Sequence, residues 1–193
     1  FQGVLVTDFF SAYNKLKGPQ QKCLVHLLRE MRQIRARDAP GDYLPPYRKL
    51  KRLIRDALRL NEQRGKLDPL VFRRRRFLLD DRLIQFACAV YSNKDWKRLS
   101  ARLLKHHRQI FAFLDHRGLS SNNNAAERAI RPHVIIRNRS YQNRTDKGAE
   151  AHSTLTSLLR SLQLQGRDPL QELQKAYLHH RQGNQKPILF AQA

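Results

Sequence analysis

Gly3-Val4-Leu5-Val6-Thr7-Asp8 is the stretch that decides the fold class, because it is a short apolar run that ends in an acid. Runs of this kind are typical of buried strands. In open α/β sheets, functional side chains gather at the carboxyl ends of the strands, which is the position of Asp8. The sequence therefore predicts a buried strand over residues 3–7, with the carboxylate of Asp8 at its tip.

A second acid stands in Ser121-Asn122-Asn123-Asn124-Ala125-Ala126-Glu127-Arg128-Ala129-Ile130-Arg131-Pro132. Glu127 is the lone carboxylate of this predicted helical turn, and amides and guanidinium groups surround it. Phosphoryl transfer on nucleic acid uses carboxylates that converge on metal ions about 4 Å apart. We therefore expect the carboxylates of Asp8 and Glu127 to lie within about 4–8 Å and to share Mg²⁺ or Mn²⁺.

The charge of the chain indicates a polyanionic partner. Among 193 residues, 38 are Lys or Arg and 16 are Asp or Glu, which gives a formal net charge of +22. This excess is far beyond what solubility needs, and nucleic acid is the expected partner. The basic residues alternate with apolar ones, and hydrophobic residues make up 40% of the chain, so it should fold.

The numbers of cysteine and methionine residues indicate the cellular compartment and whether the chain is part of a longer protein. The two cysteines, Cys23 and Cys88, cannot form a disulfide framework, and this fits a reducing compartment. No apolar run has the length of a membrane span, and no secretory signal precedes the first strand, so a cytosolic protein without membrane contact is expected. Met31 is the only methionine, so we expect the chain to be a piece of a longer protein.

Hydrophobic spacing predicts a chain that is mostly helical. Beyond the first strand, the predicted elements are a helix over 9–16, a strand over 23–25, a helix over 27–37, a helical block over 47–116, an extended patch over 134–136, a helix over 149–164 and a last helix that ends near residue 180.

Three blocks of this sequence resemble the insertion sequence 66 transposase family. They are Val6-Thr7-Asp8-Phe9-Phe10-Ser11-Ala12-Tyr13, Cys23-Leu24-Val25-His26-Leu27-Leu28-Arg29 and Asn123-Asn124-Ala125-Ala126-Glu127-Arg128-Ala129-Ile130-Arg131-Pro132. The resemblance continues through residues 137–144 and into Gly166-Arg167-Asp168-Pro169-Leu170, so it covers nearly the whole chain.

The resemblance implies a DDE-type DNA transposase with a ribonuclease H-like core. Asp8 would be the second catalytic acid and Glu127 the third, both as ligands of Mg²⁺ or Mn²⁺. The implied partner is DNA, as element ends and target, together with self-association in a transposition complex. The implied location is the prokaryotic cytoplasm, at the nucleoid.

The expected fold class is α/β, a ribonuclease H-like core truncated at its N-terminus with a large all-helical insertion, mostly α by residue count. The expected segments are the second half of the sheet with the second acid (1–38), the helical insertion (39–118), the third-acid helix and basic segment (119–148), C-terminal helices (149–182) and a loose tail (183–193).

The sequence also departs from the family pattern. The strand that carries the first acid of the family would precede residue 1, and the family's zinc-binding and DNA-recognition regions are absent from these residues. Arg137-Asn138 replaces the usual Arg-Lys, and Gln142 replaces a usual glycine. We therefore expect the C-terminal part of a catalytic domain, inactive in DNA cleavage by itself.

Basic and amide side chains around Glu127 and after it are the candidate DNA-binding residues, because guanidinium forks suit phosphate oxygens. They are Asn123, Asn124, Arg128, Arg131, Arg137, Arg139, Arg144 and Lys147. The run Arg73-Arg74-Arg75-Arg76 is open to two interpretations, a solvated helix face or a contact with the DNA backbone.

Each candidate acid also has an alternative interpretation. Asp8 is a favourable N-cap for the segment after it. Glu127 suits a capping box with Asn124 as N-cap, and an i,i+4 pair with Arg131. The rival function is thus a non-catalytic, basic nucleic-acid-binding module whose acids only cap helices.

The pair Cys23-x-x-His26 resembles half of a zinc site. Since no second pair stands at a suitable spacing, we expect a buried thiol and a histidine that is part of the core or supports a metal ligand.

Overall fold

The computed structural model describes residues 2–37, 41–139 and 143–183. Helical segments make up 73% of the described residues, which confirms the expected excess of helix. The chain divides into two compact units, Phe1–Glu127 and Arg128–Ala193. No helix in the described ranges is both long and apolar enough to cross a membrane.

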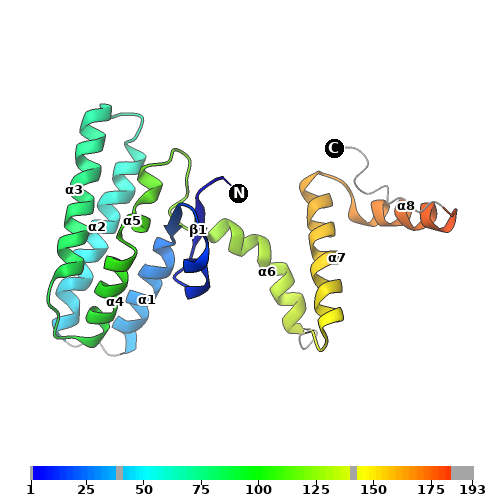
Figure 1. The fold of residues 1–193 in the computed structure, drawn as a ribbon, viewed down its shortest axis with the longest axis horizontal. Helices are drawn as coiled ribbons and strands as arrows, with labels where there is room; N and C mark the ends of the chain where they lie inside the picture. Colours follow the sequence, from blue (N-terminus) through cyan, green and yellow to red (C-terminus); the bar gives the residue numbers. More distant parts are fainter. Residues whose placement is uncertain (1, 38–40, 140–142, 184–193) are drawn as a thin grey trace. The chain divides into compact units, whose positions relative to one another are not determined.

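The sheet of the first unit consists of β1 (Leu5–Thr7) and β2 (Gln20–Lys22), which pair in parallel with Val6 opposite Gln21 (Figure 1). The first predicted strand is thereby confirmed, and Asp8 follows its last residue. The helix predicted over 9–16 is instead a short 3-10 helix, η1 (Ser11–Lys15).

The prediction of a second strand over 23–25 is wrong, because the strand lies three residues earlier. The residues of β2 are polar, yet all three are buried. The amide of Gln21 donates to the carbonyl of Ile110 (2.9 Å) and its oxygen accepts from the N–H of Phe113 (2.8 Å). Gln20 donates to the carbonyl of Tyr13 (2.8 Å). Because these bonds satisfy the buried amides, the strand needs no apolar pattern.

Helices form the rest of the first unit, as the sequence predicts. In Figure 1, α2 lies beside both α1 and α3, and α4 packs on α3. The elements are α1 (Leu24–Arg37), η2 (Gly41–Tyr43), α2 (Leu44–Glu62), α3 (Pro69–Cys88), α4 (Lys94–Lys105), α5 (His107–Ile110) and η3 (Ala112–Leu114).

Local sequence sets the starts of two of these helices. Asp68 is the N-cap of α3, and its carboxylate accepts the N–H groups of Leu70 and Val71. Pro69 follows at the first helical position, where its missing N–H costs nothing. Asn93 caps α4 in the same way, through the N–H groups at 95 and 96.

The core of the helical block is centred on Trp96, which is fully buried. Its ring stacks on Tyr43 with centroids 4.9 Å apart, and its indole N–H donates to the carbonyl of Tyr43 (3.1 Å). The Tyr43 hydroxyl in turn donates to the carbonyl of Met31 (2.9 Å). These contacts hold together α1, η2 and α4, so the block has one continuous core.

The helix α6 (Asn124–Arg139) begins in the first unit and continues in the second. The prediction of an extended patch over 134–136 is wrong, because these residues are helical and Pro132 lies inside the helix. Proline removes one backbone donor and strains the turn before it. The helix nonetheless continues, and Arg137 and Arg139 lie in its last turn.

The second unit continues with α7 (Asp146–Leu164) and α8 (Pro169–Arg181). Gly166 has φ +70° in the turn between them, a conformation that glycine adopts without a steric penalty. The buried carboxylate of Glu172 forms ion pairs with Arg167 and Lys175. The pair with Arg167 joins the turn to α8. The predicted tail over 183–193 lies, apart from its first residue, outside the described ranges.

Candidate active site

Asp8 stands directly after β1, at the carboxyl end of the parallel pair. The N–H of Cys23 donates to the carbonyl of Thr7 (2.7 Å), so the backbone after β2 remains beside this strand end. Asp8 Oδ1 accepts the N–H of Phe10 (2.9 Å). Asp8 is therefore not the N-cap of a helix, because η1 begins at Ser11 and its N-cap is Phe10. The bond from Asp8 instead closes a tight turn before η1.

A buried lysine lies close to this acid. Lys22 is the last residue of β2 and is fully buried; its Nζ donates to Thr7 Oγ1 (3.0 Å) and Gln20 Oε1 (3.1 Å). Burial lowers the pKa of Lys22, and the charge of Asp8 opposes that shift. Sequence reasoning missed this residue, because a lysine in a polar stretch gives no signal of burial.

Glu127 lies in the first turn of α6, and the structure brings it to the block that follows β2. The N–H of Leu24 donates to the carbonyl of Ser121 (3.0 Å), which places the segment before α6 beside the start of α1. Two residues further along α1, His26 Nε2 lies 3.2 Å from Glu127 Oε1. Two sequence blocks that are far apart in the chain thus meet through a backbone bond and a side-chain contact.

Neither alternative for Glu127 is seen in the described part of the chain. α6 starts at Asn124, so Asn123 takes the capping position, and its carbonyl accepts the N–H of Glu127 (3.0 Å). The carboxylate contacts His26, and no ion pair with Arg131 is formed among these residues. The side chain of Glu127 is 42% exposed, so the carboxylate remains accessible to a ligand.

Two polar atoms on residues that contact Glu127 are buried without a partner in the described ranges. They are His26 Nδ1 and Asn123 Oδ1. Because buried polar atoms in folded proteins nearly always have a hydrogen-bond partner, these two atoms are exceptions, and both belong to residues that contact Glu127. Asn123 was a candidate DNA contact, whereas His26 was considered only as a supporting or core residue.

The side chains present fit a hard divalent cation in their chemistry. Asp8 and Glu127 offer carboxylate oxygens, which Mg²⁺ and Mn²⁺ prefer. The described residues contain no group of three or more His, Cys, Asp or Glu side chains that could hold a metal ion. Cys23 is a buried free thiol and His26 contacts Glu127, so a zinc site at this pair has no support.

The candidate DNA-binding residues fall into two groups. Asn123 and Asn124 are half-buried at the start of α6, in the first unit. The basic residues lie in the second unit, and all are exposed: Arg128, Arg131, Arg137 and Arg139 on α6, Arg144 before α7 and Lys147 in its first turn.

The helical conformation of 134–136 changes how these basic residues share a surface. At 100° per residue, Arg128, Arg131 and Arg139 lie on one face of α6. Arg137 lies on the opposite face of the same helix. Along α6, Arg137 therefore does not share a face with Arg128, Arg131 and Arg139.

The run Arg73–Arg76 also divides. Arg76 contacts both Asp80 and Asp115, and its side chain is 12% exposed, so it has a structural role. Arg75 donates to Gln63 (3.2 Å). Arg73 and Arg74 are exposed and have no ion-pair partner in the part of the chain that the structure describes.

Comparison with known proteins gives one match. The model of the family described as Transposase IS66 family matches residues 1–151. This range runs from the sheet through both candidate acids to the first turns of α7 and includes all of the candidate DNA-binding residues. No curated protein and no solved structure matches the chain.

Proposed function

Since the chain belongs to the IS66 family of transposases, we propose that it is part of a DDE-type catalytic domain that cleaves and joins DNA strands during transposition. The observation that carries the proposal is the meeting of the two acid-bearing blocks. Glu127 contacts His26, and the segment that begins α1 is bonded both to Ser121 and to the strand end before Asp8.

Asp8 and Glu127 would hold a divalent cation, Mg²⁺ or Mn²⁺, in this site. When bound, such ions stabilise the attacking and leaving oxygens of a phosphoryl displacement. Asp8 is held by the N–H of Phe10 through one oxygen, and Glu127 is held by His26 through one oxygen. Each carboxylate therefore has a fixed orientation and a second oxygen available, as a ligand requires.

The reaction proposed for the complete catalytic domain has two displacements at phosphorus. A water oxygen bonds to phosphorus at the element end, the bond to the 3′ oxygen breaks, and that oxygen takes a proton and leaves as a hydroxyl. The freed 3′-hydroxyl then attacks a phosphodiester of target DNA, loses its proton and displaces the target's own 3′ oxygen. A first acid and a ribonuclease H-like core, as the family resemblance implies, would complete the catalytic set, and we propose that the 193 residues by themselves do not cleave DNA.

The test compares the 193-residue chain with the full product of its gene. We expect the full product to nick plasmid DNA that carries the element ends, only with Mg²⁺ or Mn²⁺ present. Asp8→Asn and Glu127→Gln should each abolish the nicking while DNA binding persists. Binding without nicking in the full product, unaffected by either substitution, would instead establish the rival function of a non-catalytic binding module.

A further inference from the structure

The surface of the helical block contains a hollow of about 290 Å³ whose charged lining is entirely basic. We name it the α2 groove and define it by Arg35 of α1 and Tyr47, Arg48, Lys51, Arg52 and Arg55 of α2. All five cationic side chains are exposed, whereas Tyr47 is buried at the base. Neither candidate acid is among the lining residues.

Helical spacing places four of the five cations on one face. Arg48, Lys51, Arg52 and Arg55 follow the i, i+3, i+4, i+7 pattern, so they lie within an arc of about 100°. Like charges at these spacings repel one another. In the described residues, none of the five has an acidic partner, whereas Arg82, Arg98 and Arg102 each do.

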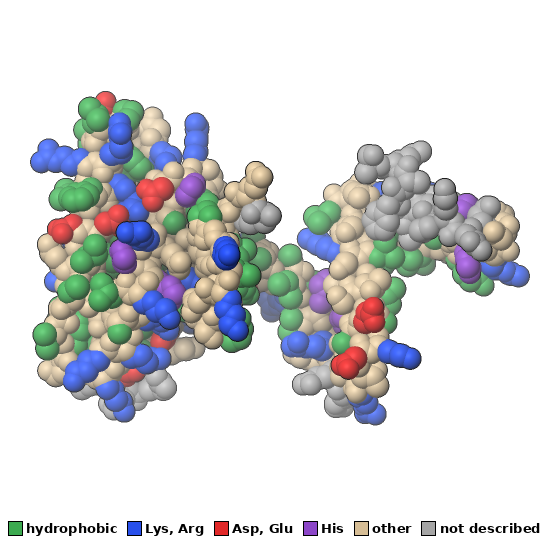
Figure 2. Space-filling model, viewed as in Figure 1, with side chains coloured by type: hydrophobic (Ala, Val, Ile, Leu, Met, Phe, Trp, Pro, Cys, Tyr) green, Lys and Arg blue, Asp and Glu red, His purple; other side chains and the backbone are tan. Residues whose placement is uncertain are grey.

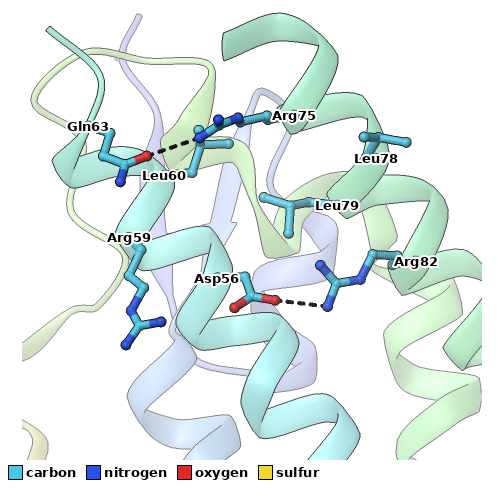
Figure 3. A pocket seen from close by; sticks show the side chains of 8 residues that line it. All are labelled: Asp56, Arg59, Leu60, Gln63, Arg75, Leu78, Leu79 and Arg82. Atoms are coloured by element: carbon cyan, nitrogen blue, oxygen red, sulfur yellow. Dashed lines mark hydrogen bonds and ion pairs between the residues drawn. The ribbon is translucent and has the colours of Figure 1, made fainter. Parts of the chain in front are cut away.

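A second hollow, between α2 and α3, shows the ordinary arrangement. Arg82 contacts Asp56 (2.9 Å) and Arg75 donates to Gln63 (3.2 Å), as Figure 3 shows. Lys and Arg side chains are spread widely over the face drawn in Figure 2, with Asp and Glu among them. The α2 groove differs because its cations converge without an acid, so an anion from outside would relieve their repulsion.

Tyr47 organises two of these cations. The Arg35 guanidinium carbon lies 5.4 Å from the centroid of the Tyr47 ring, and Lys51 Nζ lies 5.8 Å from it. Both distances are within the range of cation–π attraction. Because the ring is buried and fixed, these side chains lose less freedom when they bind a phosphate, and this favours binding.

We propose that the α2 groove binds the phosphate backbone of duplex DNA, as a second DNA contact apart from the acids; this rests on the proposed function. Arg48 and Arg55 lie about 10 Å apart along the helix axis, so the row is long enough to reach more than one phosphate of a DNA strand. A small anion would neutralise one or two cations, whereas a polyanion neutralises the row. Because contacts to phosphate oxygens carry no sequence information, the proposed backbone contact is independent of DNA sequence.

The test measures binding of the 193-residue chain to a short fluorescent duplex, without metal, by anisotropy. The groove variant is Arg48→Gln with Arg52→Gln and Arg55→Gln. The matched control is Lys94→Gln with Lys97→Gln and Lys105→Gln, which removes the same charge from exposed positions of α4. We expect the groove variant to bind the duplex at least about tenfold more weakly than the unaltered chain. Between about 50 and 200 mM salt, the slope of log affinity against log salt concentration should become less steep by about 0.9 for each cation removed.

The control variant should bind within about twofold of the unaltered chain. Equal losses in the two variants would overturn the proposal, because net charge alone would then explain binding. Tighter binding of inorganic triphosphate than of duplex, with no dependence on duplex length, would overturn it as well. Circular dichroism melting verifies folding, and removal of like-charge repulsion should leave the melting temperature of the groove variant equal or higher at low salt.

The outcome is separable from that of the proposed function. Loss of duplex binding by the groove variant supports the α2 groove even if the full gene product never nicks DNA. Unchanged binding by the groove variant overturns the α2 groove even if metal-dependent nicking is observed and requires Asp8 and Glu127.

Discussion

His26 Nε2 lies 3.2 Å from Oε1 of Glu127, and this contact joins α1, which follows the sheet, to α6, which carries Glu127. It replaces the capping role that the local sequence of Glu127 would favour. Because one oxygen of Glu127 is held from α1, the orientation of the carboxylate depends on a residue that is distant in the chain.

The first prediction concerns this contact. Side chains that hold a metal ligand in place typically affect metal affinity about 10- to 100-fold. His26→Leu should therefore weaken Mn²⁺ binding to the full gene product by about tenfold or more, measured by electron paramagnetic resonance. His26→Gln places an N–H donor near the position of Nε2 and should restore most of the affinity. Equal loss in both variants, with folding intact, would mean that His26 does not orient Glu127.

The second prediction concerns the core of the helical block. Trp96 is fully buried against Tyr43, so Trp96→Ala should cost about 3–5 kcal/mol in the free energy of unfolding. Trp96→Phe keeps an aromatic ring but removes the N–H that bonds to the carbonyl of Tyr43, and it should cost less. Urea unfolding followed by circular dichroism measures both. A loss below about 1 kcal/mol for the alanine variant would contradict the described packing.

The third prediction concerns the start of α3. The carboxylate of Asp68 accepts the N–H groups of Leu70 (2.8 Å) and Val71 (3.2 Å). Asp68→Ala should therefore destabilise the first unit by about 1 kcal/mol, while Asp68→Asn retains an acceptor and should lose much less. Thermal unfolding of the three proteins at one pH provides the comparison, and a neutral alanine variant would argue against this cap.

The fourth prediction concerns pH. His106 is buried, its Nδ1 lies 3.0 Å from Gln109, and burial lowers its pKa below 6.5. At a pH between the pKa of His106 in the folded chain and its higher pKa in the unfolded chain, the unfolded chain binds more protons. The contribution of His106 to stability is therefore complete above about pH 6.5 and is lost as the pH falls. His106→Asn should remove this part of the acid sensitivity. Chemical unfolding of the unaltered chain and of His106→Asn between about pH 5 and 8 tests this prediction. The same pH dependence of the free energy of unfolding in both proteins would refute it.

The fifth prediction separates structure from DNA binding in the run Arg73–Arg76. Arg76→Ala leaves Asp80 and Asp115 without their cation and should cost roughly 1–3 kcal/mol in stability, with DNA affinity nearly unchanged. Arg73→Ala with Arg74→Ala should leave stability nearly unchanged, because both side chains are exposed. A substantial stability loss in the double variant, measured by urea unfolding, would show that these residues also have a structural role.

Local sequence determined much of this protein. The apolar run before Asp8 is a strand, the capping residues Asp68 and Asn93 start helices, and the spacing of leucines predicted the helical block. These features depend on neighbours within a few residues, so their physical chemistry is visible in the sequence.

Tertiary structure alone decided the rest. β2 is polar and buried because distant carbonyl and N–H groups at Ile110 and Phe113 satisfy Gln21, and no local pattern records such partners. Residues 134–136 are helical although the sequence predicted an extended patch there. The contact of His26 with Glu127 and the convergence of Arg35 with the cations of α2 join separate segments of the chain. Such relations depend on how elements pack, because burial and charge are set by everything that surrounds a side chain and not by its neighbours in sequence.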